Sequence, residues 1–121
     1  QEGLISSQLA KSLRYMMKET VIRGTATGVY RKARYRKMRS LVGGKTGTLR
    51  GKKPSGITTW FVGMMPYYQP KIVVSAVVVN RSQWSIKGMH LAAESFRLWR
   101  KYKSPVNSPE ISSSKKPAKV Y

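Results

Sequence analysis

The run from Ile72 to Val79 restricts most narrowly the folds that this chain can adopt. Its residues are aliphatic, mostly β-branched, and only Ser75 interrupts them. β-Branched residues favour strands, and a run that is apolar on both faces is typical of a strand that is covered on both sides. It is far shorter than the roughly 18 apolar residues of a membrane span. We therefore predict a strand from Lys71 to Asn80 with helices on both of its faces.

Two further strand-like runs precede it, from Ser40 to Arg50 and from Ile57 to Met64. Short connections rich in Gly, Pro and polar residues separate the three runs. Because such short connections join antiparallel neighbours, we expect the three strands to form a meander.

Helical periodicity occurs before and after the strands. Over roughly residues 7–23, apolar residues recur as one buried stripe after a suitable N-cap at Ser6 or Ser7. A second helix is expected to begin at a Ser85 cap and to bury a stripe that extends to Trp99. The basic stretch between the first helix and the first strand, up to Arg39, has no clean period and is predicted to be an exposed connection.

These elements predict an α/β fold of the α+β type, with an antiparallel sheet flanked by helices. Two helices are too few to cover a sheet on both faces, and one sheet edge would stay open. We therefore expect residues 1–103 to form the C-terminal portion of a larger domain. Residues 104–121 are rich in Ser, Pro and Lys with few apolar side chains, so we expect a mobile basic tail.

The charge of the chain is strongly one-sided. Its 121 residues include 24 Lys and Arg against four Asp and Glu, a formal net charge of +20. Such a charge attracts polyanions, whether nucleic acid, anionic lipid or acidic wall polymer. For the segment from Arg31 to Arg39 the simplest interpretation is a solvated connection, with acidic wall or lipid partners the next choice ahead of nucleic acid.

The composition offers little for metal or thiol chemistry. The chain has no Cys, one His and no Asp. A disulfide framework and a Cys-ligated zinc site are therefore excluded, and we expect neither a metal nor another cofactor. The one histidine, His90, lies on the last predicted helix and is expected to be structural.

The sharpest local feature is Lys45-Thr46-Gly47-Thr48, within the first strand-like run. It lacks both the first Gly and the following helix of a phosphate-binding loop. On a strand, Thr46 and Thr48 share one face while Lys45 and Gly47 lie on the other. Two hydroxyls about 7 Å apart can donate to one carboxylate. Lys45 would add positive charge, and Gly47 would let another backbone approach. The pattern suits a peptide that ends in a free carboxylate.

This motif and its surroundings resemble the transpeptidase domain of class B penicillin-binding proteins. Lys-Thr-Gly on a strand is the third active-site motif of penicillin-binding proteins and serine beta-lactamases. The resemblance covers roughly Leu9 to Trp99 and rests on several landmarks in the family's order. These are Arg23-Gly24-Thr25-Ala26 at a helix end, Lys45-Thr46-Gly47-Thr48, Trp60-Phe61-Val62-Gly63, Pro66-Tyr67, and Pro70-Lys71-Ile72 before a Val-rich strand.

The resemblance implies a peptidoglycan D,D-transpeptidase that works through a serine acyl-enzyme and binds penicillin. In that family the Ser of a Ser-x-x-Lys motif attacks the penultimate D-Ala of a stem peptide and passes the acyl group to an amine. By resemblance, Thr46 and Thr48 would bind the terminal carboxylate, and the N–H of Thr48 would be an oxyanion donor. Lys45 would place positive charge beside the substrate, and Gly47 would leave room for the acyl chain.

One departure from the family pattern bears on activity. Ser-x-x-Lys occurs only at Ser112 and Ser113, in the expected tail, where a composition rich in Ser and Lys produces it by chance. We therefore expect the nucleophile in an N-terminal remainder of the domain, and we expect this chain to be inactive alone.

The resemblance also implies partners and a location. The expected ligands are D-Ala-D-Ala stem peptides and beta-lactams, and no specific nucleic acid is expected. The expected location is extracytoplasmic, with membrane contact only through an anchor outside the chain. Two alternatives stay open: a serine beta-lactamase or beta-lactam sensor of the same fold, and a basic nucleic-acid-binding module.

Overall fold

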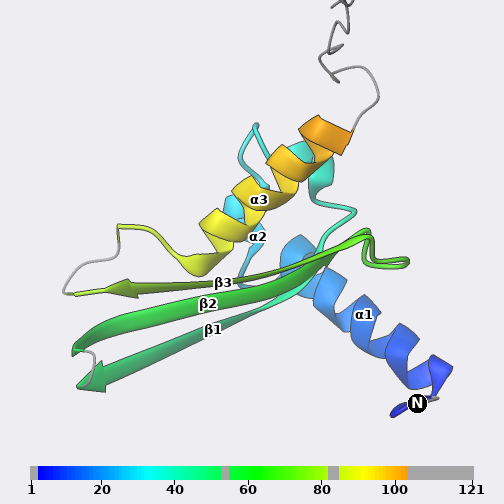
Figure 1. Cartoon of the computed structure of the whole chain (residues 1–121), viewed down its shortest axis with the longest axis horizontal. Coiled ribbons are helices and arrows are strands. Elements are labelled where there is room, and N and C mark those ends of the chain that lie inside the picture. Colours follow the sequence, from blue (N-terminus) through cyan, green and yellow to red (C-terminus); the bar gives the residue numbers. More distant parts are fainter. Residues whose placement is uncertain (1–2, 53–54, 82–84, 104–121) are drawn as a thin grey trace, which may run out of the picture.

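Three antiparallel strands and two long helices make up most of the computed structural model, which describes residues 3–52, 55–81 and 85–103 (Figure 1). The strands occur in the order β1-β2-β3, and both pairs are antiparallel. The predicted meander and the α+β class are therefore confirmed. The elements in chain order are α1 (Ser7–Ile22), α2 (Thr27–Tyr30), the 3-10 turn η1 (Arg36–Met38), β1 (Gly43–Lys52), β2 (Ser55–Met65), β3 (Ile72–Asn80) and α3 (Gly88–Lys103).

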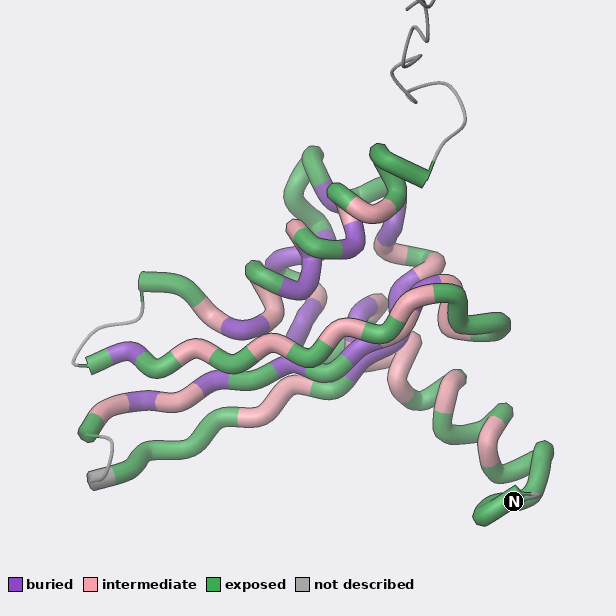
Figure 2. The backbone as a smooth tube through the Cα atoms, viewed as in Figure 1, coloured by how far each residue is buried: buried purple, intermediate pink, exposed green. Residues whose placement is uncertain are grey.

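Helix α1 begins where the sequence predicts it. The Oγ of Ser6 accepts a hydrogen bond of 3.2 Å from the N–H of Leu9, which satisfies one donor of the first turn. Its predicted apolar stripe is covered only towards its C-terminal end, where α1 packs against β1. Val21 is fully buried, whereas Leu9 and Leu13 are 48% and 43% exposed. Figure 2 shows the N-terminal part of α1 as largely exposed.

Helix α3 covers one face of the sheet, and the other face is exposed. On β3, Ile72, Val74 and Ala76 pack against the core, while Val73 and Val77 are 63% and 60% exposed. The prediction that this strand is covered on both faces is wrong for this chain. The reason is that α3 packs on one side of β2 and β3, whereas α1 packs against β1 (Figure 1).

The segment between α1 and β1 contributes much of the core, so its prediction as an exposed connection was wrong for its apolar residues. Tyr30 and Met38 are buried, and the Tyr30 ring lies 6.3 Å from the ring of Phe61 on β2. Because α2 and η1 are single turns, their buried residues have no extended helical spacing that a periodicity search could detect. Arg39 is partly buried, and its Nη2 donates to the backbone oxygen of Ile22. The other cations of the segment stay in solvent, as predicted. They are Arg31, Lys32, Arg34, Arg36 and Lys37.

Helix α3 begins at Gly88 and not at the predicted Ser85 cap. The hydroxyl of Ser85 donates instead to Oδ1 of Asn80 at 2.9 Å. The N–H of Gly88 donates to Oγ1 of Thr59 at 3.0 Å, so a β2 side chain fixes the start of the helix. The predicted apolar stripe of this helix is present, because its buried residues include Ala92, Ala93 and Phe96.

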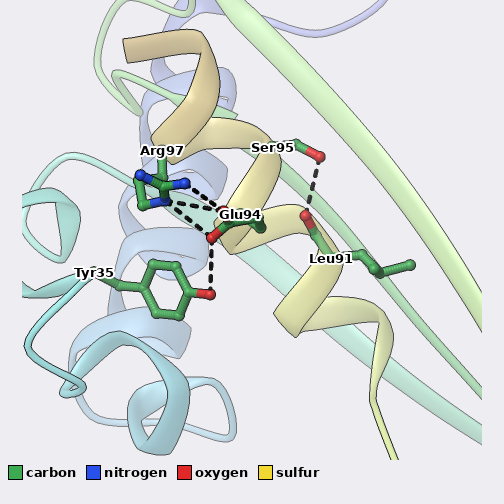
Figure 3. Close-up of polar contacts among 5 residues, drawn as sticks. All are labelled: Tyr35, Leu91, Glu94, Ser95 and Arg97. Atoms are coloured by element: carbon green, nitrogen blue, oxygen red, sulfur yellow. Dashed lines mark hydrogen bonds and ion pairs between the residues drawn. The ribbon is translucent and has the colours of Figure 1, made fainter. Parts of the chain in front are cut away.

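A polar network joins α3 to the segment before β1 (Figure 3). The hydroxyl of Tyr35 donates to Oε2 of Glu94 at 3.1 Å, and Nη2 of Arg97 lies 2.5 Å from Oε1 of Glu94. The hydrogen bonds from Arg97 lower the pKa of Glu94 to about 2, and the Tyr35 hydroxyl adds to this effect while burial opposes it. Because Tyr35 and Glu94 are 59 residues apart, the network fastens two distant parts of the chain.

Acid should loosen this network. The folded pKa of Glu94 is about 2 and its ordinary value is 4.5, so the stability from its carboxylate is present above the ordinary value and lost as the pH falls towards 2. The urea midpoint should therefore fall less on acidification for Glu94→Gln than for the unchanged chain. Glu19→Gln removes a carboxylate outside the network and is the comparison variant. Indistinguishable pH profiles for the two variants would refute the role of Glu94.

Gly44 allows the Phe61 ring to lie directly against β1. A Cβ at position 44 would overlap that ring, which is fully buried and has no open space to enter. Gly44→Ala should lower the free energy of unfolding by about 1–3 kcal/mol in urea titrations. Gly28→Ala is the control, because nothing lies within 4 Å of its added Cβ, and it should not destabilise the chain. Equal losses at the two positions would show that this packing contributes nothing.

Candidate functional site

The Lys-Thr-Gly-Thr motif lies on β1, and three of its residues line a pocket of about 280 Å³. The other parts of the wall come from β2, from the turn after α1 and from the start of α3. The lining residues are Thr25, Thr46, Gly47, Thr48, Thr59, Trp60, Lys87, Gly88 and Met89.

The strand register places the two threonines of the motif on the same face. Thr46 pairs with the buried Phe61 and Thr48 with the buried Thr59. Because directly paired residues on neighbouring strands share a face, both threonines lie on the side of the sheet that α3 covers. This is the arrangement that strand alternation predicts.

Lys45 lies apart from the pocket. It pairs with the exposed Val62, is itself exposed, and is not among the lining residues. Its Nζ donates to the backbone oxygen of Thr46 at 2.9 Å. The cation in the lining is instead Lys87, which comes just before α3 and was not singled out from the sequence.

Gly47 makes room for an aromatic side chain of the neighbouring strand. A Cβ at this position would overlap the indole of Trp60, its partner on β2. Trp60 is 39% exposed, whereas Phe61 is fully buried. Of these two aromatic residues, Phe61 therefore belongs to the core, and the indole of Trp60 lies across Gly47 on the opposite face of the sheet.

Thr25 is the main site residue that sequence reasoning missed. Its Oγ1 lies 2.6 Å from Oγ1 of Thr46, and either hydroxyl can be the donor. One of the two hydroxyl hydrogens lies between the two oxygens. The hydrogen of the other hydroxyl can then be donated to a ligand. Thr25 belongs to a landmark of the family resemblance, but it is 21 residues from Thr46, and no local pattern connects the two.

The pocket suits an anion. Its lining combines threonines with Lys87, and it contains no carboxylate. Hydroxyls and an ammonium group are donors to a carboxylate, and charge-assisted hydrogen bonds are the stronger kind. The lining also contains no Ser, Cys or His, so nucleophilic chemistry would have to come from residues outside it.

His90 lies outside this pocket. Its Nδ1 accepts a hydrogen bond of 3.2 Å from the N–H of Lys87. Burial and the nearby positive charge of Lys32 lower the pKa of His90. Across residues 3–52, 55–81 and 85–103, no group of three or more His, Cys, Asp or Glu could hold a metal ion. In the same ranges, no helix is both long and apolar enough to cross a membrane.

Comparison with known proteins identifies the class to which this fold and pocket belong. The family model described as the penicillin binding protein transpeptidase domain matches residues 1–98, which is most of the chain. The chain therefore belongs to the penicillin-binding protein transpeptidase family, as its resemblance implied. Proteins with this domain bind peptidoglycan substrates and beta-lactams, and they are typically extracytoplasmic. No curated protein and no solved structure matched the chain.

Proposed function

We propose that this chain supplies the carboxylate-binding and oxyanion strand of a serine D,D-transpeptidase that cross-links peptidoglycan stem peptides. The proposal rests mainly on one observation: Thr46, Gly47 and Thr48 line a pocket that is rich in donors, in a chain of the transpeptidase family. The ligands are D-Ala-D-Ala stem peptides and beta-lactams, and the site of action is outside the cytoplasm.

Thr46 and Thr48 bind the terminal carboxylate of the stem peptide. Both hydroxyls belong to the same face of β1, about 7 Å apart at strand spacing, which allows them to donate to one carboxylate. Thr25 holds the Thr46 hydroxyl in place through their 2.6 Å contact. Lys87 in the lining and Lys45 on the other face add positive potential. The carboxylate of a beta-lactam uses the same donors.

The outer edge of β1 aligns the peptide and polarises its carbonyl. Within the described residues β1 pairs with β2 alone, so alternate N–H groups on its other side are open to an extended ligand. The N–H of Thr48 is the oxyanion donor in this proposal. A contact of that kind is worth about 3–4 kcal/mol in acyl-transfer sites.

The acyl transfer itself requires a serine from another part of the domain. That Ser attacks the carbonyl of the penultimate D-Ala, the bond to the last D-Ala breaks, and an amine then takes the acyl group from the Ser. Ser-x-x-Lys occurs here only at Ser112 and Ser113, which lie outside the described residues. We assign the nucleophile to an N-terminal remainder of the domain.

Thr48→Val should weaken binding of an N-acyl-D-Ala-D-Ala peptide by about tenfold or more, because a hydrogen bond to a charged group is lost. Amide shifts of residues 46–48, followed by NMR as the peptide is added, measure the affinity. Thr58→Val is the matched control, because Thr58 pairs with Leu49 on the opposite face of the sheet and does not line the pocket. Equal weakening by both variants would argue against the site, as would equally tight binding of a peptide whose carboxylate is amidated.

The chain alone should form no covalent adduct with a fluorescent penicillin, because the proposed nucleophile is not among its described residues. Gel fluorescence and intact mass after incubation measure the adduct. Stoichiometric labelling would overturn the assignment of the nucleophile to another segment. Hydrolysis of the penicillin by the chain would instead favour the beta-lactamase alternative.

A further inference from the structure

Two basic segments that are far apart in the sequence meet at one end of the molecule. Nη1 of Arg100 on α3 donates to the backbone oxygen of Lys37 at 3.2 Å, across 63 residues. The C-terminal end of α3 lies beside the segment that precedes β1 (Figure 1). We refer to the exposed cations of these two segments as the basic surface. They are Arg31, Lys32, Arg34, Arg36, Lys37, Arg100, Lys101 and Lys103.

The described residues offer few carboxylates to neutralise the basic surface. The described residues contain two, Glu19 and Glu94. Glu19 pairs with Arg23 at 3.4 Å. Both oxygens of Glu94 already accept hydrogen bonds, from Arg97 and from Tyr35 (Figure 3). Glu94 also lies close enough to Arg34 for that cation to help lower its pKa, but this one carboxylate leaves most of the basic surface without a counter-charge.

Two residues of the basic surface line a pocket of about 400 Å³. Lys32 and Arg34 bring two cations to its lining, and His90 adds an imidazole. Because Nδ1 of His90 accepts the N–H of Lys87, the hydrogen of the neutral ring is on Nε2, which is then a donor. The remaining lining residues are Tyr35, Ser85, Ile86, Leu91 and Glu94.

We propose that this pocket and the basic surface bind the phosphate head group of an anionic phospholipid at a membrane surface. Lys32 and Arg34 bind the phosphate, and Arg in particular can do so through two parallel hydrogen bonds. A membrane contact of this kind is additional to any anchor and independent of transpeptidase chemistry.

The apolar part of the lining distinguishes a lipid from other polyanions. Ile86 and Leu91 are 39% and 42% exposed and line the same pocket, so they suit hydrocarbon next to a head group. At the end of α3, Tyr102 is 68% exposed, and aromatic residues beside cations are typical of membrane interfaces. Single-stranded nucleic acid would need an aromatic face in the pocket on which bases stack, but the aromatic side chain there, Tyr35, is buried.

Vesicle co-sedimentation of the full chain tests the proposal. The chain should bind vesicles of mixed phosphatidylglycerol and phosphatidylcholine, and not phosphatidylcholine alone. Lys32→Gln with Arg34→Gln should weaken binding by about 20-fold, since each cation near an anionic surface changes affinity by about fivefold. The matched control is Arg50→Gln with Lys71→Gln, which removes the same charge from exposed positions outside the basic surface. It should cost less than about twofold, because salt screens charges beyond roughly 8 Å.

Two further measurements separate the proposal from its alternatives. Lys32→Arg with Arg34→Lys keeps the charge and should keep the binding, which separates loss of charge from loss of fold. His90 is the single histidine, so its ring signals in NMR should shift with short-chain phosphatidylglycerol and stay unchanged with phosphatidylcholine. Equal losses from the Gln double variant and its matched control would overturn the proposal. So would duplex DNA that binds as tightly as the vesicles and is weakened equally by Lys32→Gln with Arg34→Gln.

Discussion

The burial of Phe61 is the interaction on which the rest of the structure depends. Its ring is fully buried, lies 6.3 Å from Tyr30, and packs where Gly44 has no side chain. Because Phe61 is buried, the face of β2 that carries it is the face that packs against α3. The pairing of β1 with β2 then places Thr46, the partner of Phe61 on β1, on the same face. A slip of one residue would turn the threonines to the exposed side, so the core and the pocket depend on one register.

Both proposed binding sites follow from the small number of carboxylates in this chain. The chain has a net charge of +20, and the described carboxylates are engaged with arginines and with Tyr35. Its remaining cations and hydroxyls therefore have donor capacity for external anions. The anion that we propose at the threonine pocket is a carboxylate bound by hydroxyls, and the anion that we propose at the basic surface is a phosphate bound by cations. The two sites differ in chemistry because threonines are prominent in the lining of the first, whereas Lys32 and Arg34 contribute to the lining of the second.

Much of the fold follows from local periodicity, and the errors arise where packing between distant segments decides. The three strands and the start of α1 could be predicted because alternation and capping are local signals. The segment before β1 was misjudged, since its core residues Tyr30 and Met38 belong to single turns. The exposed face of β3 was misjudged because β-branched composition does not reveal whether a helix is present to cover it. Ser85 is of a residue type that favours a helix cap, but its hydroxyl donates to Oδ1 of Asn80.

The sequence by itself determined that Thr46 and Thr48 share a face, because a strand repeats every two residues and needs no further information. It also determined the excess of positive charge. Only the tertiary structure decided that Thr25 and Lys87 join those threonines, that Phe61 and not Trp60 enters the core, and that Lys37 meets Arg100. The physical reason is that these contacts join segments tens of residues apart, whose meeting depends on how helices and sheet pack together.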